Sequence, residues 1–208
     1  MLFDLDGVLV DSRGVVETVW RRWAKLRDVD PEPFIAVAHG RRGSETIRLV
    51  APELDARSEA AVLDEMEARE TEGLAAIPGA ARLLESLRGR RWGIVTSGSV
   101  PIATLRLRAV GLEPPGVMVT GEQVKHGKPD PEGYLLGATL LGAEPSHCLV
   151  FEDATVGIEA ARAAAMRVVA VATTHERAAL QTADAIVGDL TRVGVASREG
   201  QLVVTIDP

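Results

Sequence analysis

Residues 148–172, CLVFEDATVGIEAARAAAMRVVAVA, contain the pattern that decides the fold. A short apolar run ends in two acidic residues, an alanine-rich helical stretch follows, and a second apolar run comes next. This order predicts a βαβ unit, whose two strands lie parallel in one sheet. The connection in such a unit is right-handed, which fixes the face of the sheet that the helix covers.

The same alternation continues outward from this unit. Expected strands occupy residues 1–5, 92–96, 117–120, 148–151, 168–172 and 185–187. Expected helices occupy residues 79–87, 101–110, 132–141 and 157–165. Together they predict an α/β fold with a doubly wound parallel sheet, which binds ligands beyond the carboxyl ends of its strands. Two apolar runs within residues 193–206, separated by residues 197–200, predict a terminal hairpin.

Residues 12–76 form the exception, because they contain no convincing strand. Helices are expected there, broken at residues 30–33 and 51–52, and residues 59–72 are dense in good helix formers. We therefore expect a core made of residues 1–11 and 77–208, with a helical insertion at 12–76. The first strand is very short as given, which leaves open a natural start upstream of Met1.

The composition excludes several classes of protein. A net charge of −7 argues against a general nucleic-acid binder, which needs a basic surface. No apolar run is long enough for a membrane span, and no signal-peptide pattern opens the chain. The single cysteine, Cys148, cannot form an internal disulfide and is expected in a buried strand. We expect a cytoplasmic monomer with neither nucleic acid nor membrane as a partner.

The first chemical motif is FDLDGVLVDS at residues 3–12. Asp4 and Asp6 follow a strand, and Gly7 permits a sharp turn that lets both carboxylates approach one metal and one phosphorus. One carboxylate can act as a nucleophile and the other as a general acid and base. An acidic strand end that caps the next helix would give the same residues.

The second motif is VTSGSVP at residues 95–101. The hydroxyl of Ser97 and the free amide of Gly98 precede a helix, which makes an anion-binding site. Helix capping alone is the alternative.

The third motif is KHGKPDP at residues 125–131. Lys128 could neutralise both a nucleophilic carboxylate and phosphoryl oxygens, although an isolated lysine of this kind is more often a surface residue.

The fourth motif is the strand end at Glu152 and Asp153, already quoted. Carboxylate oxygens at a strand end suit Mg²⁺, and helix capping is again the alternative. The four motifs each follow a strand, so the topology would bring them to one crevice.

In this combination the motifs resemble the haloacid dehalogenase-like phosphatase superfamily over nearly the whole chain. The resemblance implies a Rossmann-like core with an inserted helical cap domain at residues 12–76. It also implies that Asp4 is the nucleophile and Asp6 the general acid and base. Ser97 and the Gly98 amide would hold the transferring phosphoryl group beside Lys128.

The same resemblance implies an Mg²⁺ cofactor and a small phosphorylated metabolite as the partner. Asp4, the main-chain carbonyl of Asp6 and Asp153 would bind the metal, with Glu152 in or near its coordination shell. The activity implied is hydrolysis of phosphate monoesters through an aspartyl-phosphate.

A closer similarity, to glycerol-phosphate and 2-deoxyglucose-6-phosphate phosphatases, rests on residues 39–42, 92–99, 123–129 and 150–157. It makes sugar or polyol phosphates the expected substrates. His39, Arg41 and Arg42 in the insertion become candidate substrate contacts, and a solvated helix end is their alternative explanation.

Three rival functions remain to be weighed. A phosphomutase would share the aspartyl-phosphate, but β-phosphoglucomutases carry a histidine at the position of Val16 that helps to hold back the general acid and base. A catalytically silent phospho-metabolite sensor would be expected to lack Asp4 or Asp6. A dehalogenase would lack Asp6 and Asp153. All of these acids are present, so a phosphatase is the prediction.

Overall fold

The structure is a computed structural model that describes residues 1–198 and 201–207. Its centre is a six-stranded sheet of order β5-β4-β1-β6-β7-β8, with parallel pairing throughout. The strands are β1 (Leu2–Phe3), β4 (Gly93–Val95), β5 (Met118–Val119), β6 (Leu149–Glu152), β7 (Arg167–Val171) and β8 (Ala185–Val187). Each overlaps a strand expected from the sequence, and the predicted α/β fold is confirmed.

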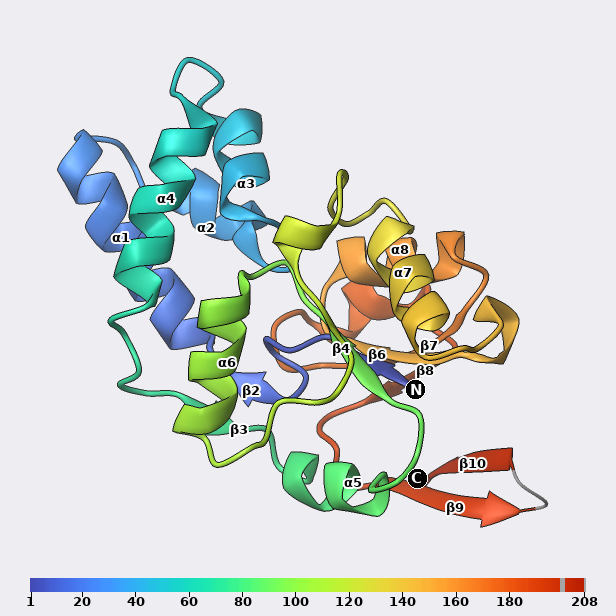
Figure 1. The fold of residues 1–208 in the computed structure, drawn as a ribbon. Coiled ribbons are helices and arrows are strands. Elements are labelled where there is room, and N and C mark those ends of the chain that lie inside the picture. The colour runs from blue at the N-terminus through green and yellow to red at the C-terminus, as the bar shows by residue number, and fades with distance from the viewer. Residues whose placement is uncertain (199–200, 208) are drawn as a thin grey trace.

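Helices cover both faces of this sheet (Figure 1). Successive strand residues point to opposite faces, so Leu2 packs in one hydrophobic cluster and Phe3 in the other. The Phe3 face is covered by α5 (Ala80–Ser86) and α6 (Val100–Ala109). The Leu2 face is covered by α7 (Glu132–Leu140) and α8 (Thr155–Ala163). Short 3₁₀ turns occur at Gly121–Gln123, Pro145–His147 and Arg177–Leu180.

Strand β1 lies at the point where the strand order reverses. The chain passes from β1 to β4 and β5 on one side, and later to β6, β7 and β8 on the other. Connections diverge at such a point and leave a crevice beyond the carboxyl ends of the strands. Asp4 follows β1, and Asp153 follows β6, so both reach this crevice.

Four helices between β2 (Val10–Asp11) and β3 (Ala75–Ala76) form a separate layer, the helical unit. They are α1 (Arg13–Arg27), α2 (Glu32–Ala38), α3 (Gly43–Val50) and α4 (Ala56–Glu67). The rings of Trp20, Trp23 and Phe34 pack against one another at its centre, with centroids 4.9 to 5.5 Å apart. This apolar cluster is distinct from the two that flank the sheet. In Figure 1 the unit stands at the upper left of the molecule.

The expectation that residues 12–76 contain no strand is wrong at one place. Strand β3 (Ala75–Ala76) pairs antiparallel with β2 (Val10–Asp11). Two alanines give no β-branched signal, and they pair because the chain leaves and re-enters the core side by side. The resulting ribbon connects the sheet to the helical unit.

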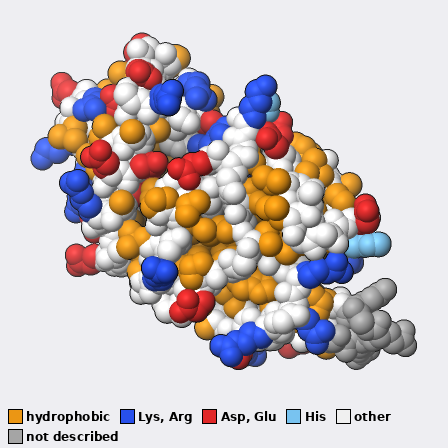
Figure 2. Space-filling model, in the orientation of Figure 1, with side chains coloured by type: hydrophobic (Ala, Val, Ile, Leu, Met, Phe, Trp, Pro, Cys, Tyr) orange, Lys and Arg blue, Asp and Glu red, His pale blue; other side chains and the backbone are white. Residues whose placement is uncertain are grey.

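The chain ends in the expected hairpin, formed by β9 (Val193–Arg198) and β10 (Gln201–Ile206), while residues 199–200 of its expected turn lie outside the described residues. Cys148 is buried, as predicted, but it lies just before β6 and not in the expected strand. Helices that are both long and apolar enough to cross a membrane are absent from the described part of the chain. On the face shown in Figure 2, basic and acidic side chains are interspersed, and apolar ones gather over the middle.

Candidate active site

A tight loop after β1 brings Asp4 and Asp6 to the crevice. The amides of Val8, Leu9 and Val10 all donate to the carbonyl of Leu5, which folds the loop back on itself. Gly7 has φ +74°, and a Cβ there would lie 2.0 Å from Oδ2 of Asp153. The glycine is therefore required both by the turn and by the close approach of a carboxylate.

Three carboxylates and one ammonium meet at the centre of the site. Asp4, Glu152 and Asp153 place carboxylate oxygens within 4.8 Å of one another, and all three side chains are buried. Lys128 Nζ lies 2.9 Å from Asp4 Oδ1 and also pairs with Glu152. With all four groups ionised, the cluster has two negative charges in excess. A buried excess of charge is relieved either by protonation of a carboxylate or by a further cation.

The pKa values of this cluster show the same excess. Burial raises the pKa of Asp4 to about 7, with Lys128 opposing the shift and Glu152 adding to it. Burial, with the charges of Glu152 and Asp4, raises the pKa of Asp153 well above its ordinary value. Burial would lower the pKa of Lys128, but the charges of Asp4 and Glu152 outweigh it and raise that pKa. One lysine does not offset three buried carboxylates.

Glu152 points inward and is held there by four donors. Its Oε1 accepts from Lys128 and, at 2.7 Å, from the hydroxyl of Tyr134. Its Oε2 accepts from the amides of Asp153 and Ala154 at 3.0 and 3.2 Å. With both oxygens used, Glu152 positions Lys128 and the turn after β6. Asp4 and Asp153 remain the acids best placed to face an ion.

The cluster fits a divalent cation by charge and by ligand type. Mg²⁺ prefers oxygen ligands and usually takes one or two carboxylates while keeping several waters. Asp4 and Asp153 supply such carboxylates, and a charge of +2 would balance the excess described above. These residues therefore fit the metal that the sequence predicts.

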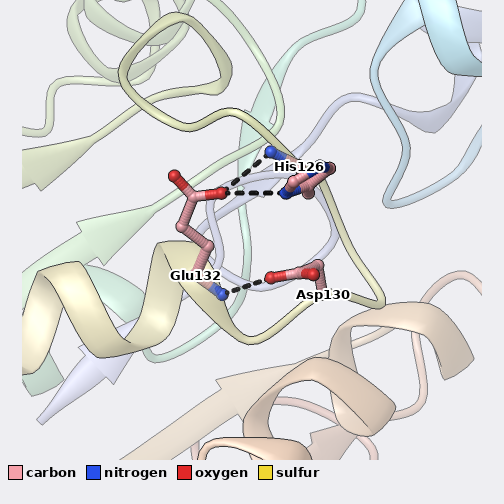
Figure 3. Close-up of side chains that lie close together, drawn as sticks. All are labelled: His126, Asp130 and Glu132. Carbon is pink, nitrogen blue, oxygen red and sulfur yellow. Dashed lines mark hydrogen bonds and ion pairs between the residues drawn. The ribbon is translucent and has the colours of Figure 1, made fainter.

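A second cluster of possible metal ligands within the described residues consists of His126, Asp130 and Glu132, and it stabilises a loop (Figure 3). Glu132 accepts the amides of Lys125 and His126, each at 2.9 Å, and its Oε2 lies 3.5 Å from Nδ1 of His126. Asp130 accepts the amide of Glu132 at 3.0 Å. These bonds fix the loop that carries Lys128, and they account for the positions of all three side chains.

Ser97 and Gly98 follow β4 and border the same crevice. Ser97 Oγ donates to the carbonyl of Gly40, in the helical unit, at 2.8 Å. The amide of Gly98 donates to Oγ1 of Thr96 at 3.2 Å. The hydroxyl predicted to bind phosphate thus contacts the backbone of the helical unit in this arrangement.

The three candidate residues of the helical unit separate into two groups. His39 and Arg41 line a pocket between the unit and the sheet, together with Asp4, Asp6 and Ser97. Burial, with the charge of nearby His175, lowers the pKa of His39. Arg41, in the loop between α2 and α3, donates to the carbonyl of Val37 in α2.

Arg42 points away from that pocket. It donates to the carbonyls of Gly121, Val124 and Lys125, each at 3.2 Å, and pairs with Glu45. Glu45 in turn accepts the amide of Gly127 at 3.1 Å. Arg42 therefore joins the helical unit to the loop that carries Lys128, and it lines a neighbouring pocket beside that lysine.

Sequence reasoning missed Arg106, which lines the pocket from α6. Its side chain is 5% exposed, and it pairs with Asp6 at 2.8 Å and with Glu67 at 2.6 Å. A signal was present, because Arg106 interrupts the otherwise apolar buried stripe of Ile102, Ala103 and Leu107. A charged residue in a buried stripe calls for buried partners.

The chain is similar to characterised phosphatases over nearly its full length. It is 42% identical to hexitol phosphatase A of Escherichia coli, and the match covers 98% of this chain and 97% of that protein. It is 34% identical to 2-deoxyglucose-6-phosphate phosphatase 2 of Saccharomyces cerevisiae, covering 99% and 94%. The crystal structure of a hydrolase from Pseudomonas syringae matches with a TM-score of 0.81 at 30% identity, covering 91% and 93%.

The family model of haloacid dehalogenase-like hydrolases matches residues 1–165. That range runs from β1 through α8 and contains Asp4, Asp6, Ser97, Lys128 and Asp153. The resemblance predicted from the sequence motifs is confirmed, and the chain belongs to the haloacid dehalogenase-like hydrolases.

Proposed function

We propose that this enzyme is an Mg²⁺-dependent phosphatase that hydrolyses small sugar- or polyol-phosphate monoesters through an aspartyl-phosphate on Asp4. The observation that carries the proposal is the buried excess of negative charge around Asp4 and Asp153, beside a single lysine. Such an arrangement suits a carboxylate that attacks phosphorus once a cation balances its neighbours.

The reaction takes two displacements at phosphorus. In the first, an oxygen of Asp4 bonds to phosphorus, the ester bond to the substrate oxygen breaks, and the proton of Asp6 passes to that oxygen. In the second, a water oxygen attacks phosphorus, the bond to Asp4 breaks, and Asp6 takes the proton of the water. The products are the free alcohol and inorganic phosphate.

The other groups of the site would bind and orient the phosphoryl group. Lys128 would neutralise its oxygens, and Ser97 and the Gly98 amide would donate to them. Mg²⁺, held by Asp4, the Asp6 carbonyl and Asp153 with Glu152 nearby, would supply charge stabilisation of the phosphoryl oxygens. Ser97 must exchange its bond to Gly40 for one to phosphate, which favours a helical unit that moves when substrate enters.

The helical unit would therefore act as a cap over residues 1–11 and 77–208. His39 and Arg41 line the pocket and are proposed as contacts to the hydroxyl-bearing part of the substrate. The names of the similar phosphatases, which refer to a hexitol and to 2-deoxyglucose 6-phosphate, support a substrate of this class. The cytoplasmic location, the monomeric state and the absence of nucleic-acid partners stay predictions from the sequence.

The test is a panel of hexitol phosphates, hexose 6-phosphates, glycerol phosphate and phosphoglycolate with Mg²⁺, assayed for phosphate release. We expect the highest kcat/KM for a hexitol or hexose 6-phosphate. Release of phosphate from none of these compounds would exclude the proposal.

The panel should include β-glucose 1-phosphate with a trace of the 1,6-bisphosphate. Val16 lines the pocket and has no polar group with which to restrain Asp6. Phosphate release without isomerisation is therefore expected. Glucose 6-phosphate formed faster than free phosphate would instead identify a mutase.

A further inference from the structure

Arg106 connects three parts of the molecule through one guanidinium. The residue belongs to α6 of the core, its Nη1 reaches Oδ1 of Asp6 at 2.8 Å, and its Nη2 reaches Oε2 of Glu67 at 2.6 Å. Glu67 is the last residue of α4 in the helical unit. Two separate nitrogens of the fork are used, so the contacts do not compete.

The environment keeps this guanidinium charged and fixed. Burial would lower the pKa of Arg106, but the charges of Asp6 and Glu67 outweigh burial and raise that pKa. Burial raises the pKa of Glu67, although Arg106 opposes the shift. Each charge is thus buried at a cost that its partner offsets, and loss of either partner leaves the other poorly paired.

Asp6 is constrained through one of its two oxygens. Ser12 Oγ donates to Oδ1 at 2.6 Å, and Arg106 contacts the same Oδ1. The side chain of Asp6 is 28% exposed and borders the pocket, whereas Arg106 is 5% exposed. Arg106 therefore contacts, from the more deeply buried part of the pocket wall, the carboxylate of Asp6 that borders the same pocket.

We propose that Arg106 is a positioning residue that couples docking of the helical unit, through Glu67, to the orientation of Asp6. The inference rests on the proposed function, because it assigns Asp6 the proton transfers. With Glu67 docked, both ends of the fork are engaged and Asp6 is held in place. With Glu67 withdrawn, Arg106 loses one of the two partners that fix it, and Asp6 loses a rigid support.

The experiment compares two substrates with the full chain and Mg²⁺. A sugar phosphate releases a poor leaving group and needs the proton of Asp6 in the first step. 2,4-Dinitrophenyl phosphate releases a good leaving group and needs none, although water attack on the aspartyl-phosphate still needs Asp6. Stopped-flow detection of dinitrophenolate separates the first step from turnover.

For Arg106→Met we expect kcat on the sugar phosphate to fall about 10²-fold or more, the range of general acid and base catalysis. The dinitrophenolate burst should persist and be followed by slow turnover. Arg108→Met is the matched control, an exposed arginine of the same helix, and should match wild type on both substrates. The inference would be overturned if Arg106→Met and Arg108→Met had the same kcat on the sugar phosphate. It would also be overturned if a folded Arg106→Met variant lost the dinitrophenolate burst to the same extent as it lost turnover.

Two milder variants keep the test valid if Arg106→Met does not fold. Arg106→Lys retains one charge but not the fork, and should also keep the burst while slowing turnover. Glu67→Gln removes only the charge at the helical unit, and should raise KM more than it lowers kcat. A lysine variant with wild-type turnover, or a glutamine variant with unchanged KM, would contradict the proposal.

The outcomes also separate this inference from the proposed function. A wild-type burst that is lost in Asp4→Asn supports the aspartyl-phosphate whatever Arg106 does. Full activity in Asp4→Asn would instead contradict the proposed function, and the inference would fall with it.

Discussion

The carboxyl ends of the core strands and the facing edge of the helical unit form the two walls of one pocket, but they are built differently. The core wall includes Asp4, whose carboxylate pairs with the buried Lys128, and Lys128 pairs in turn with the buried Glu152. Most of the described bonds between the helical unit and the core have a backbone group as one partner, as where Ser97 donates to the carbonyl of Gly40, and the Arg106–Glu67 pair is the exception. The core wall therefore depends on the types of its side chains, and the wall formed by the helical unit depends on how that unit docks against the core.

This difference predicts where a substitution should matter. A change in the core wall removes a group that touches the phosphoryl group, so it should reduce kcat on every substrate. A change at the docking edge should alter how readily the pocket closes, and so should act mainly on KM.

The largest effect is expected for Asp4→Asn. An amide cannot attack phosphorus in place of a carboxylate, so kcat should fall on the order of 10⁴-fold or more while the fold is retained. The measurement is phosphate release from a hexose or hexitol 6-phosphate. Asp11→Asn, an exposed acid of β2, is the control and should stay near wild type. Comparable phosphate release by Asp4→Asn and Asp11→Asn would contradict the role of Asp4 as the nucleophile in the core wall.

Removal of the metal should have the second-largest effect on activity. Activity should vanish in EDTA and return with Mg²⁺, and Ca²⁺ should inhibit because its looser coordination misplaces Asp4. Asp153→Asn should require more Mg²⁺ for half-maximal activity. Asp130→Asn, from the group of side chains in Figure 3, should not require more Mg²⁺, since an asparagine oxygen can still accept the Glu132 amide. Equal metal requirements in the two variants would argue against the buried site.

The smallest effect is expected at the docking edge, for Arg42→Met. Loss of its bonds to three backbone carbonyls should cost about 1–2 kcal/mol of docking, or roughly a 5- to 30-fold rise in KM, with kcat nearly unchanged. Arg48→Met is the control, because Arg48 is exposed on α3, the helix that begins directly after Arg42. Equal shifts for all sugar phosphates would indicate docking. A reordered substrate preference would indicate that Arg42 contacts substrate, as the sequence predicts.

The sequence predicted the core wall better than the docking edge, for a physical reason. Asp4, Lys128 and Asp153 have chemistry that depends on residue type, and parallel strands bring their ends to one side. The docking edge depends on backbone carbonyls, which each residue possesses and no sequence pattern marks. The bonds of Ser97 to Gly40 and of Arg42 to the loop after β5 could not be anticipated for that reason.

Strand β3 and Arg106 were missed for other reasons. The pairing of Ala75–Ala76 is fixed by where the chain re-enters the core, and alanine carries no β signal. Arg106 was detectable as a charge in a buried stripe, but its partners Asp6 and Glu67 are far away in the sequence. Only the folded chain brings the three together.

The most direct test of the central claim is to trap the aspartyl-phosphate. The enzyme with Mg²⁺ is mixed with 2,4-dinitrophenyl phosphate, quenched in acid within milliseconds and digested, and the peptide of residues 1–13 is sequenced by mass spectrometry. We expect one added phosphoryl group on Asp4, sensitive to hydroxylamine and absent from Asp4→Asn. Steady turnover with no phosphoryl group on this peptide at any quench time, or with the group on Asp6, would contradict the account.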